Sequence, residues 1–114
     1  MENKLKPIAI TDEKGNEYVL EFNRETVRFA ENRGFDISEL TKYPQTNIPL
    51  LFFYAFRKNH KNISRGQTDD LLDRLGGLTG EEIERLAQLY NQPTESLIIA
   101  EDGGRKNSKL KVVL

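Results

Sequence analysis

The longest apolar stretch of the chain lies near its middle, at residues 48–56, and reads Ile-Pro-Leu-Leu-Phe-Phe-Tyr-Ala-Phe. A basic cluster, Arg-Lys-Asn-His-Lys at residues 57–61, follows at once. Thr46 or Asn47 can cap the start of a helix here, and Pro49 suits a first turn, where its missing N–H is not needed. We therefore predict a helix over residues 48–56, around which the rest of the chain is arranged.

This predicted helix is apolar on both sides. With about 100° of rotation per residue, one side gathers Ile48, Leu51, Phe52, Ala55 and Phe56. The other side holds Leu50, Phe53 and Tyr54 around Arg57. A helix that is apolar on both sides is normally covered on both. Either a neighbouring helix or hairpin of the same chain covers the second side, or a partner protein does.

Residues 7–22 alternate between apolar and polar side chains, with Ile8 and Ile10 on one arm and Tyr18, Leu20 and Phe22 on the other. This period of two is typical of half-buried strands, and the polar residues 12–16 between the arms are turn formers. The pattern predicts a β-hairpin. A lone hairpin is marginal in water, so its apolar side is expected to lie on helices.

Capping residues place the other helices. Asn23 caps a helix over 24–33 that stops at Gly34, and Asp36 opens a short helical turn over 36–40. Ser64 or Thr68 caps a helix ending at Leu75, with Leu71, Leu72 and Leu75 on one face. Thr79 and Glu82 form a capping box for a helix that Asn91 and Pro93 close, and a last short helix covers 94–100.

These elements predict an α+β fold that is mostly α, in which an N-terminal β-hairpin packs on a small bundle of about five helices. We expect a single domain over residues 1–102, followed by a basic and then apolar tail over residues 103–114. The tail is expected either to be flexible or to add as a strand to the hairpin edge, in the same chain or in a neighbouring copy. Its apolar side chains are Leu110, Val112, Val113 and Leu114.

The composition of the chain limits which partners, chemistry and cellular location can be expected. The 114 residues carry a formal net charge of -1, which gives no global electrostatic attraction to nucleic acid or to an anionic membrane. The absence of cysteine excludes disulfides and thiolate chemistry, and the first residues lack an apolar run of signal-peptide length. The central helix is too short to span a bilayer. A cytoplasmic location is therefore expected.

The sequence offers little catalytic chemistry. His60, the single histidine, sits among lysines without an adjacent carboxylate and is interpreted as a solvated surface residue. Asp69, Asp70 and Asp73 could in principle hold a divalent cation, but they lack further oxygen ligands. We therefore expect no enzyme activity, no cofactor and no metal, and rank a metal-dependent hydrolase using these aspartates last.

Residues 68–91 have the outline of a helix-turn-helix, so a small helical nucleic-acid-binding regulator is an alternative function. The second helix, however, begins with Glu81, Glu82 and Glu84, at the end where DNA binders place groups that meet phosphates. These carboxylates would repel the phosphate backbone of DNA. The basic residues Arg24, Arg28, Arg33, Arg57, Lys58 and Lys61 are better explained as a solvated face.

Two segments resemble a known family. The first is Phe-Asn-Arg-Glu-Thr-Val-Arg-Phe-Ala-Glu-Asn-Arg-Gly-Phe at residues 22–35. The second is Leu-Phe-Phe-Tyr-Ala-Phe-Arg-Lys-Asn-His at residues 51–60, continuing through Leu-Gly-Gly-Leu at 75–78 to Leu-Tyr-Asn at 89–91. Together, over roughly residues 17–99, the chain resembles the tail assembly chaperones of long-tailed phages (siphoviruses) and prophages of Gram-positive bacteria.

The resemblance implies a small, non-catalytic protein of the bacterial host cytoplasm that is absent from the mature virion. Its implied partners are the tape measure protein and, as a second partner, tail tube subunits; a homo-oligomer is a further expectation. A long, apolar-rich helical client would lie in a groove as an amphipathic helix. The predicted client-binding residues are Leu50, Phe53 and Tyr54 with Arg57 at the rim, and the tail residues Leu110, Val112, Val113 and Leu114.

Overall fold

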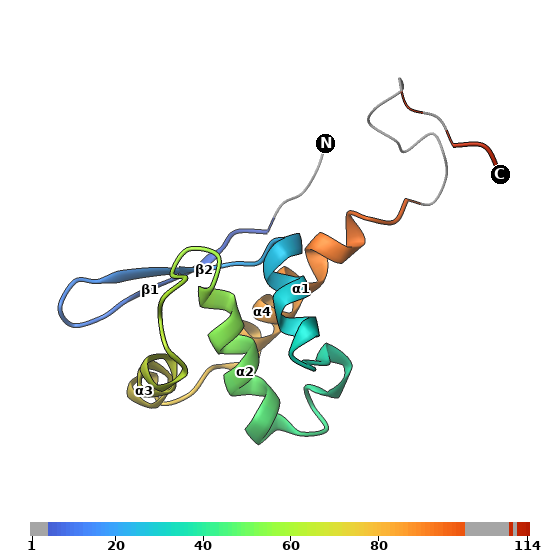
Figure 1. Ribbon diagram of the computed structural model, residues 1–114. Coiled ribbons are helices and arrows are strands. Elements are labelled where there is room, and N and C mark those ends of the chain that lie inside the picture. Colours follow the sequence, from blue (N-terminus) through green and yellow to red (C-terminus); the bar gives the residue numbers. More distant parts are fainter. Residues whose placement is uncertain (1–4, 100–109, 111) are drawn as a thin grey trace.

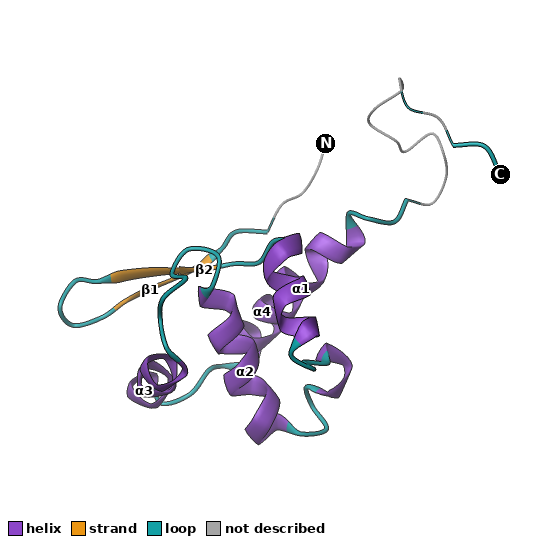
Figure 2. Ribbon diagram, viewed as in Figure 1, coloured by secondary structure: helices purple, strands orange, loops and turns teal. Residues whose placement is uncertain are grey.

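The fold is α+β and mostly α, as the sequence predicts. The computed structural model describes residues 5–99, 110 and 112–114. The elements follow in the order β1 (Ile8–Thr11), β2 (Glu17–Leu20), α1 (Arg24–Asn32), the 3-10 helix η1 (Ile37–Glu39), α2 (Pro44–Phe56), α3 (Arg65–Leu75) and α4 (Gly80–Glu95). Figures 1 and 2 show the hairpin extending from one side of the helices.

The hairpin has the predicted alternation and turn. β1 and β2 pair antiparallel, with Ile8 opposite Leu20 and Ile10 opposite Tyr18. Ile8 and Ile10 are half-buried, whereas Ala9 between them is exposed. The Asp12 carboxylate accepts hydrogen bonds from the backbone N–H groups of Lys14 and Asn16, each at 2.9 Å. The Asp12 side chain therefore closes the turn, as short acidic side chains often do.

The predicted capping residues begin the helices. Asn23, Ser64 and Thr79 each accept a hydrogen bond from the backbone N–H three residues later, and each belongs to a reciprocal capping box. Of the two caps proposed for α3, Ser64 is the actual one. Thr68 instead lies fully buried inside α3 and donates its hydroxyl to the Arg65 carbonyl at 3.1 Å.

The predicted start of the central helix is wrong. α2 begins at Pro44, four residues before Ile48, and Pro49 lies inside the helix. Pro44 fits the first helical position, where its ring sets a helical φ. Asn47 does not cap the helix; its side-chain amide donates to the Glu39 carbonyl at 3.0 Å and ties α2 to η1.

The predicted break near Pro93 is also wrong. α4 runs through Pro93 to Glu95, and no separate helix follows over the described residues 96–99. A proline there removes one hydrogen bond, to the Leu89 carbonyl, in the last turns of the helix. Because Leu89 and Tyr90 are both buried at 4% exposure, packing holds α4 in place across that defect.

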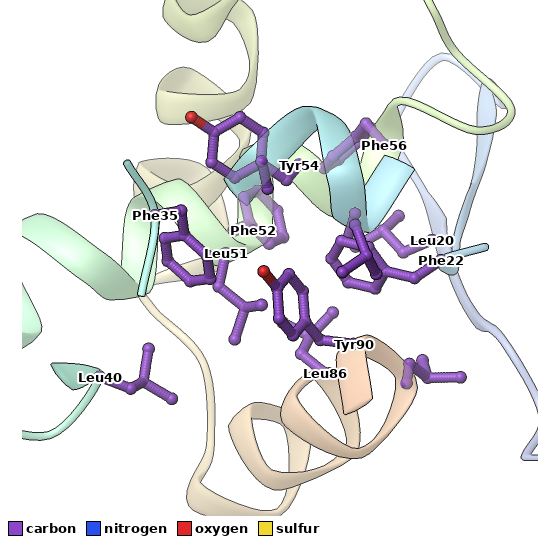
Figure 3. Packing of buried hydrophobic residues seen from close by; sticks show 14 of the residues in the cluster. Leu20, Phe22, Phe35, Leu40, Leu51, Phe52, Tyr54, Phe56, Leu86 and Tyr90 are labelled. Atoms are coloured by element: carbon purple, nitrogen blue, oxygen red, sulfur yellow. The ribbon is translucent and has the colours of Figure 1, made fainter. Parts of the chain in front are cut away.

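α2 is the central element of the core. It contacts β2, α1, η1, α3 and α4, and Figure 1 shows it between α1 and α3 with α4 behind it. Leu51, Phe52, Ala55 and Phe56 are at most 1% exposed, whereas Ile48, predicted to share this face, is only half-buried. Figure 3 shows the buried side chains converging from α2, α4 and the hairpin.

Candidate partner-binding surface

Three of the predicted client-binding residues form a stripe along the outer side of α2. Leu50, Phe53 and Arg57 are spaced by three and four residues, so they lie above one another on a helix. All three are half-buried. Leu50 and Phe53 pack against the buried core and keep part of their surface in solvent.

Tyr54 does not belong to this stripe, and its assignment to an exposed side is corrected. It is 4% exposed. Its ring meets those of Phe29 and Phe35 edge-on, with centroids 6.0 and 5.6 Å apart, as edge-to-face aromatic pairs prefer. Tyr54 is displaced by about 100° around α2 from Phe53, and this rotation turns it under α1. Tyr54 is therefore covered by residues of its own chain and not left for a partner protein.

Phe29 of α1 is held between two arginines. The guanidinium carbons of Arg33 and Arg57 lie 3.7 and 3.5 Å from the centroid of its ring. Two groups this close to one centroid cannot share a side, so they stack on opposite faces of the ring. Each stack is a cation–π contact. Arg57, predicted at the rim of the surface, thereby joins α2 to α1.

Phe53 also has an arginine neighbour, which comes from α3. The guanidinium carbon of Arg65, in the first turn of α3, lies 5.9 Å from the Phe53 ring centroid. We call one set of residues the arginine–aromatic surface: Leu50 and Phe53 of α2 with its C-cap Arg57, Phe29 of α1 with its C-cap Arg33, and Arg65 of α3.

The arginine–aromatic surface is cationic. Arg65 pairs with Asp69 at 3.5 Å, but none of the ion pairs among the described residues involves Arg33 or Arg57. Their guanidinium edges remain able to donate hydrogen bonds to a partner, and carboxylates are their preferred acceptors. The surface therefore offers apolar contact at its centre and cationic donors at both flanks.

Sequence reasoning missed Phe29, Arg33 and Arg65 as members of this surface. One signal was present: an aromatic residue precedes an arginine by four positions twice, at Phe29–Arg33 and at Phe53–Arg57. That spacing places both side chains of a pair on one helix face. The stack of Arg57 on Phe29 crosses between helices, however, and no local pattern encodes it.

The predicted tail residues are exposed. Leu110, Val112, Val113 and Leu114 are 69%, 61%, 94% and 114% exposed. None of them is in a strand, and the sheet of the described residues contains β1 and β2 alone. Leu97, Ile98 and Ile99, the apolar residues of the last short helix predicted over 94–100, are also exposed and lie beyond the end of α4.

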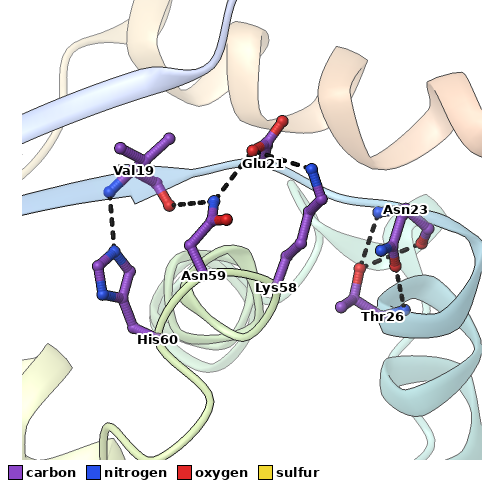
Figure 4. A network of polar contacts seen from close by, with 7 residues as sticks. All are labelled: Val19, Glu21, Asn23, Thr26, Lys58, Asn59 and His60. Carbon is purple, nitrogen blue, oxygen red and sulfur yellow. Dashed lines mark hydrogen bonds and ion pairs between the residues drawn. The ribbon is translucent and has the colours of Figure 1, made fainter.

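His60 is not a solvated surface residue. It is half-buried, and its Nε2 accepts a hydrogen bond from the Val19 backbone N–H at 2.9 Å. The Asn59 side-chain amide donates to the Val19 carbonyl at 3.0 Å, and Lys58 pairs with Glu21 at 3.0 Å (Figure 4). The basic cluster after α2 therefore fastens β2 to the helices, which explains these polar residues structurally.

Two of the three aspartates of α3 pair with arginines of the same helix. Asp69 pairs with Arg65 and Asp70 pairs with Arg74 at 3.0 Å, each one turn away. No group of three or more histidine, aspartate or glutamate residues within the described part of the chain could hold a metal ion. Over the same residues, no helix has the length and apolar character needed to cross a membrane.

The chain belongs to the family described as a domain of unknown function, DUF5055, whose family model matches residues 1–114. The comparison with curated proteins found no match, and neither did the comparison with solved structures.

Proposed function

We propose that this member of the DUF5055 family is a non-catalytic phage tail assembly chaperone that binds the tape measure protein through the arginine–aromatic surface. Tail tube subunits are a second proposed partner. The chaperone acts in the cytoplasm of the bacterial host and does not remain in the mature virion. The resemblance of residues 22–35 and 51–60 to tail assembly chaperones supports the choice of client.

The observation that carries the binding mode is the placement of three arginines over two half-exposed aromatic rings, Phe29 and Phe53. Aromatic residues and arginine are enriched among the residues that dominate binding energy at protein interfaces. The side chains of this surface are anchored by their packing on α1 and α2, so little side-chain entropy is lost on binding. An amphipathic client helix would place its apolar side on Phe53 and Leu50 and its carboxylates beside Arg33 and Arg57.

Co-expression tests the proposed client directly. We expect the tape measure protein of the same genome to be insoluble when expressed alone, and soluble and co-purified when expressed with this chain. A tape measure protein that stays soluble alone and does not co-purify would contradict the proposal.

Charge reversal tests the proposed surface. Arg57→Glu removes the stack on Phe29 and places a carboxylate where the client is expected to bring its own. We expect at least a roughly tenfold loss of client affinity, the size expected when an interface hot spot is removed. The matched control is Arg28→Glu, which makes the same charge change on α1 at an exposed position outside the surface. Thermal melting of both variants separates loss of binding from loss of folding.

A nucleic-acid-binding regulator is the competing function and makes a different prediction. It requires binding to DNA that weakens steeply with added salt, because phosphate contacts release counterions. In the α3–α4 pair, Glu82 turns back to accept from the Thr79 backbone N–H at 2.9 Å, and Glu81 and Glu84 are exposed beside it. We expect a flat titration of labelled duplex DNA at low salt; salt-sensitive binding would favour the regulator.

A further inference from the structure

The two edges of the hairpin differ. The outer edge of β2 is occupied, because the Val19 N–H donates to His60 and the Val19 carbonyl accepts from Asn59. Both backbone groups of Val19 therefore point away from β1. In an antiparallel pair, opposite residues point their backbone groups either toward each other or away from each other. Ala9, the partner of Val19 in the register, accordingly points its N–H and C=O to the outer edge of β1.

The outer edge of β1 is open. Thr11 follows Ala9 by two residues and shares its orientation, so two N–H and two C=O groups lie along this edge. Outside the hairpin ladder, no hydrogen bond among the described residues reaches the backbone of Ala9 or Thr11. Unpaired edges of this kind accept an additional strand.

A groove of about 250 Å³ lies against the open edge. All four residues of β1 line it, together with apolar side chains from the rest of the domain: Leu20 of β2, Phe52 of α2, Leu75 of α3, Leu86 of α4, and Leu78 between α3 and α4. Because consecutive strand residues point to opposite faces, a groove that all four line reaches the edge of the strand as well as the inner face that carries Ile8 and Ile10. Leu75 is 47% exposed at its rim. The groove therefore combines backbone partners with apolar side chains.

An acidic side chain, that of Glu82, lines this groove. Glu81 and Glu84 stand exposed at the same end of α4. An extended segment that suits the groove would have apolar side chains at alternate positions and a basic flank.

The C-terminal segment of the chain has this chemistry. Leu110, Val112 and Leu114 alternate, so an extended backbone presents all three on one face. Lys109 and Lys111 supply the positive charge, and no acid follows Asp102. All three apolar side chains are at least 61% exposed. Figure 1 shows the end of the chain on the far side of the molecule from the hairpin turn, so a single chain leaves both segment and groove uncovered.

We propose that the C-terminal segment of a second copy of this chain adds as a strand to the outer edge of β1. Its Leu110, Val112 and Leu114 face the groove, and Val113 faces away. Two copies that exchange segments reciprocally form a closed dimer with two such sites. Main-chain hydrogen bonds to Ala9 and Thr11 supply affinity, and the groove selects the side chains. This surface uses none of the residues of the arginine–aromatic surface.

Sedimentation equilibrium of the full chain tests the proposal. We expect a concentration-dependent mass rising from 13.1 kDa toward twice that value. Val112→Asp places a charge in the groove and should raise the dimer dissociation constant at least about tenfold, which corresponds to about 1.4 kcal/mol. Val113→Asp makes the same change one residue along and should leave the constant within about twofold. Equal effects at both positions would overturn the strand geometry.

A second variant tests the groove itself, without any change in the C-terminal segment. Leu75→Lys alters the exposed rim of the groove and should also raise the dimer dissociation constant at least about tenfold. Mixing the Leu75→Lys and Val112→Asp proteins leaves one intact groove facing one intact segment, so heterodimer should form. No heterodimer, or a wild-type chain that stays at 13.1 kDa at every concentration, would overturn the proposal.

Discussion

At the scale of single residues, Phe53 and Tyr54 are neighbours in sequence with different surroundings. Tyr54 is closed in by Phe29, Phe35 and Phe53, whereas the Phe53 ring keeps part of its surface in solvent and touches Arg65. Substitution of each by alanine should separate stability from binding.

We expect Tyr54→Ala to lower the free energy of unfolding by about 3–5 kcal/mol, as for other large buried rings. Phe53→Ala should lower it by about 1–2 kcal/mol, because less contact is lost, while it weakens client binding more than folding. Urea denaturation of the two variants gives the comparison. Equal losses of stability would assign Phe53 to the core and remove it from the proposed surface.

Tyr90 gives a prediction about alkaline pH. Burial, and then the charges of Glu31 and Asp36, raise the pKa of its phenol from 10.0 to about 12. The folded chain therefore binds this proton more tightly than the unfolded chain does. The resulting stability is fully present below pH 10.0 and is lost as the pH rises toward about 12.

The measurement is the near-ultraviolet absorbance of tyrosinate in the wild type and in Tyr90→Phe. Subtracting the two titrations isolates one of the four tyrosines. We expect the difference curve to rise near pH 12. A rise near pH 10.0 would show that Tyr90 is accessible to solvent in the folded chain.

At the scale of elements, the hairpin is held to the helices by hydrogen bonds between distant segments. His60 and Val19 are 41 residues apart, and the His60 ring also lies 5.2 Å from the Tyr18 ring. The backbone of Glu21 adds a bond to the Ala55 carbonyl at 3.1 Å. The segment after α2 therefore sets the position of β2.

We expect His60→Phe to cost about 1–3 kcal/mol of unfolding free energy, because the ring contacts are kept but the Val19 N–H loses its acceptor. The exposed neighbour provides the control: Lys61→Ala should change stability by less than about 0.5 kcal/mol. Amide hydrogen exchange locates the effect, with faster exchange expected at Val19. An unchanged Val19 exchange rate would mean that the bond does not hold the strand.

The sequence predicted those elements whose signals are local. Asn23 and Thr79 mark helix starts through contacts with the following turn, and Ile8 and Ile10 mark the hairpin through their period. The prediction placed Pro49 in the first turn of the central helix, but Pro44 suits a first turn equally well and is where α2 begins. The bond of Asn47 to Glu39, outside the helix, shows why Asn47 failed as a cap.

The candidate site was less predictable than the fold. Periodicity separated Leu50 and Phe53 from the deep core but could not reveal that α1 covers Tyr54. His60 looked solvated because its acceptor role depends on Val19, which lies far away in the sequence. Contacts between elements, rather than the patterns within them, decide which apolar residues remain at the surface.

At the scale of the whole molecule, one helix contacts most of the other elements. α2 contacts β2, α1, η1, α3 and α4, and its Leu51 and Ala55 are fully buried. Since a two-stranded hairpin is marginal without such support, the hairpin and the helices should not unfold separately.

We expect one cooperative transition in urea. The helical circular dichroism signal and the methyl resonances of Ile8 and Ile10 in the hairpin should share a midpoint, the test of two-state unfolding. Methyl signals that change at lower urea than the helical signal would show that the hairpin is an independent unit.

The unequal edges of the hairpin limit how many hairpins can join directly edge to edge. In polymer chemistry, units with two reactive ends extend without limit, whereas a unit with one reactive end terminates growth. Because Asn59 and His60 occupy the edge of β2, the hairpin can receive a strand on one side only. The hairpins therefore cannot join edge to edge into an endless ribbon. The side chains of Asn59 and His60 act as chain terminators for this kind of growth.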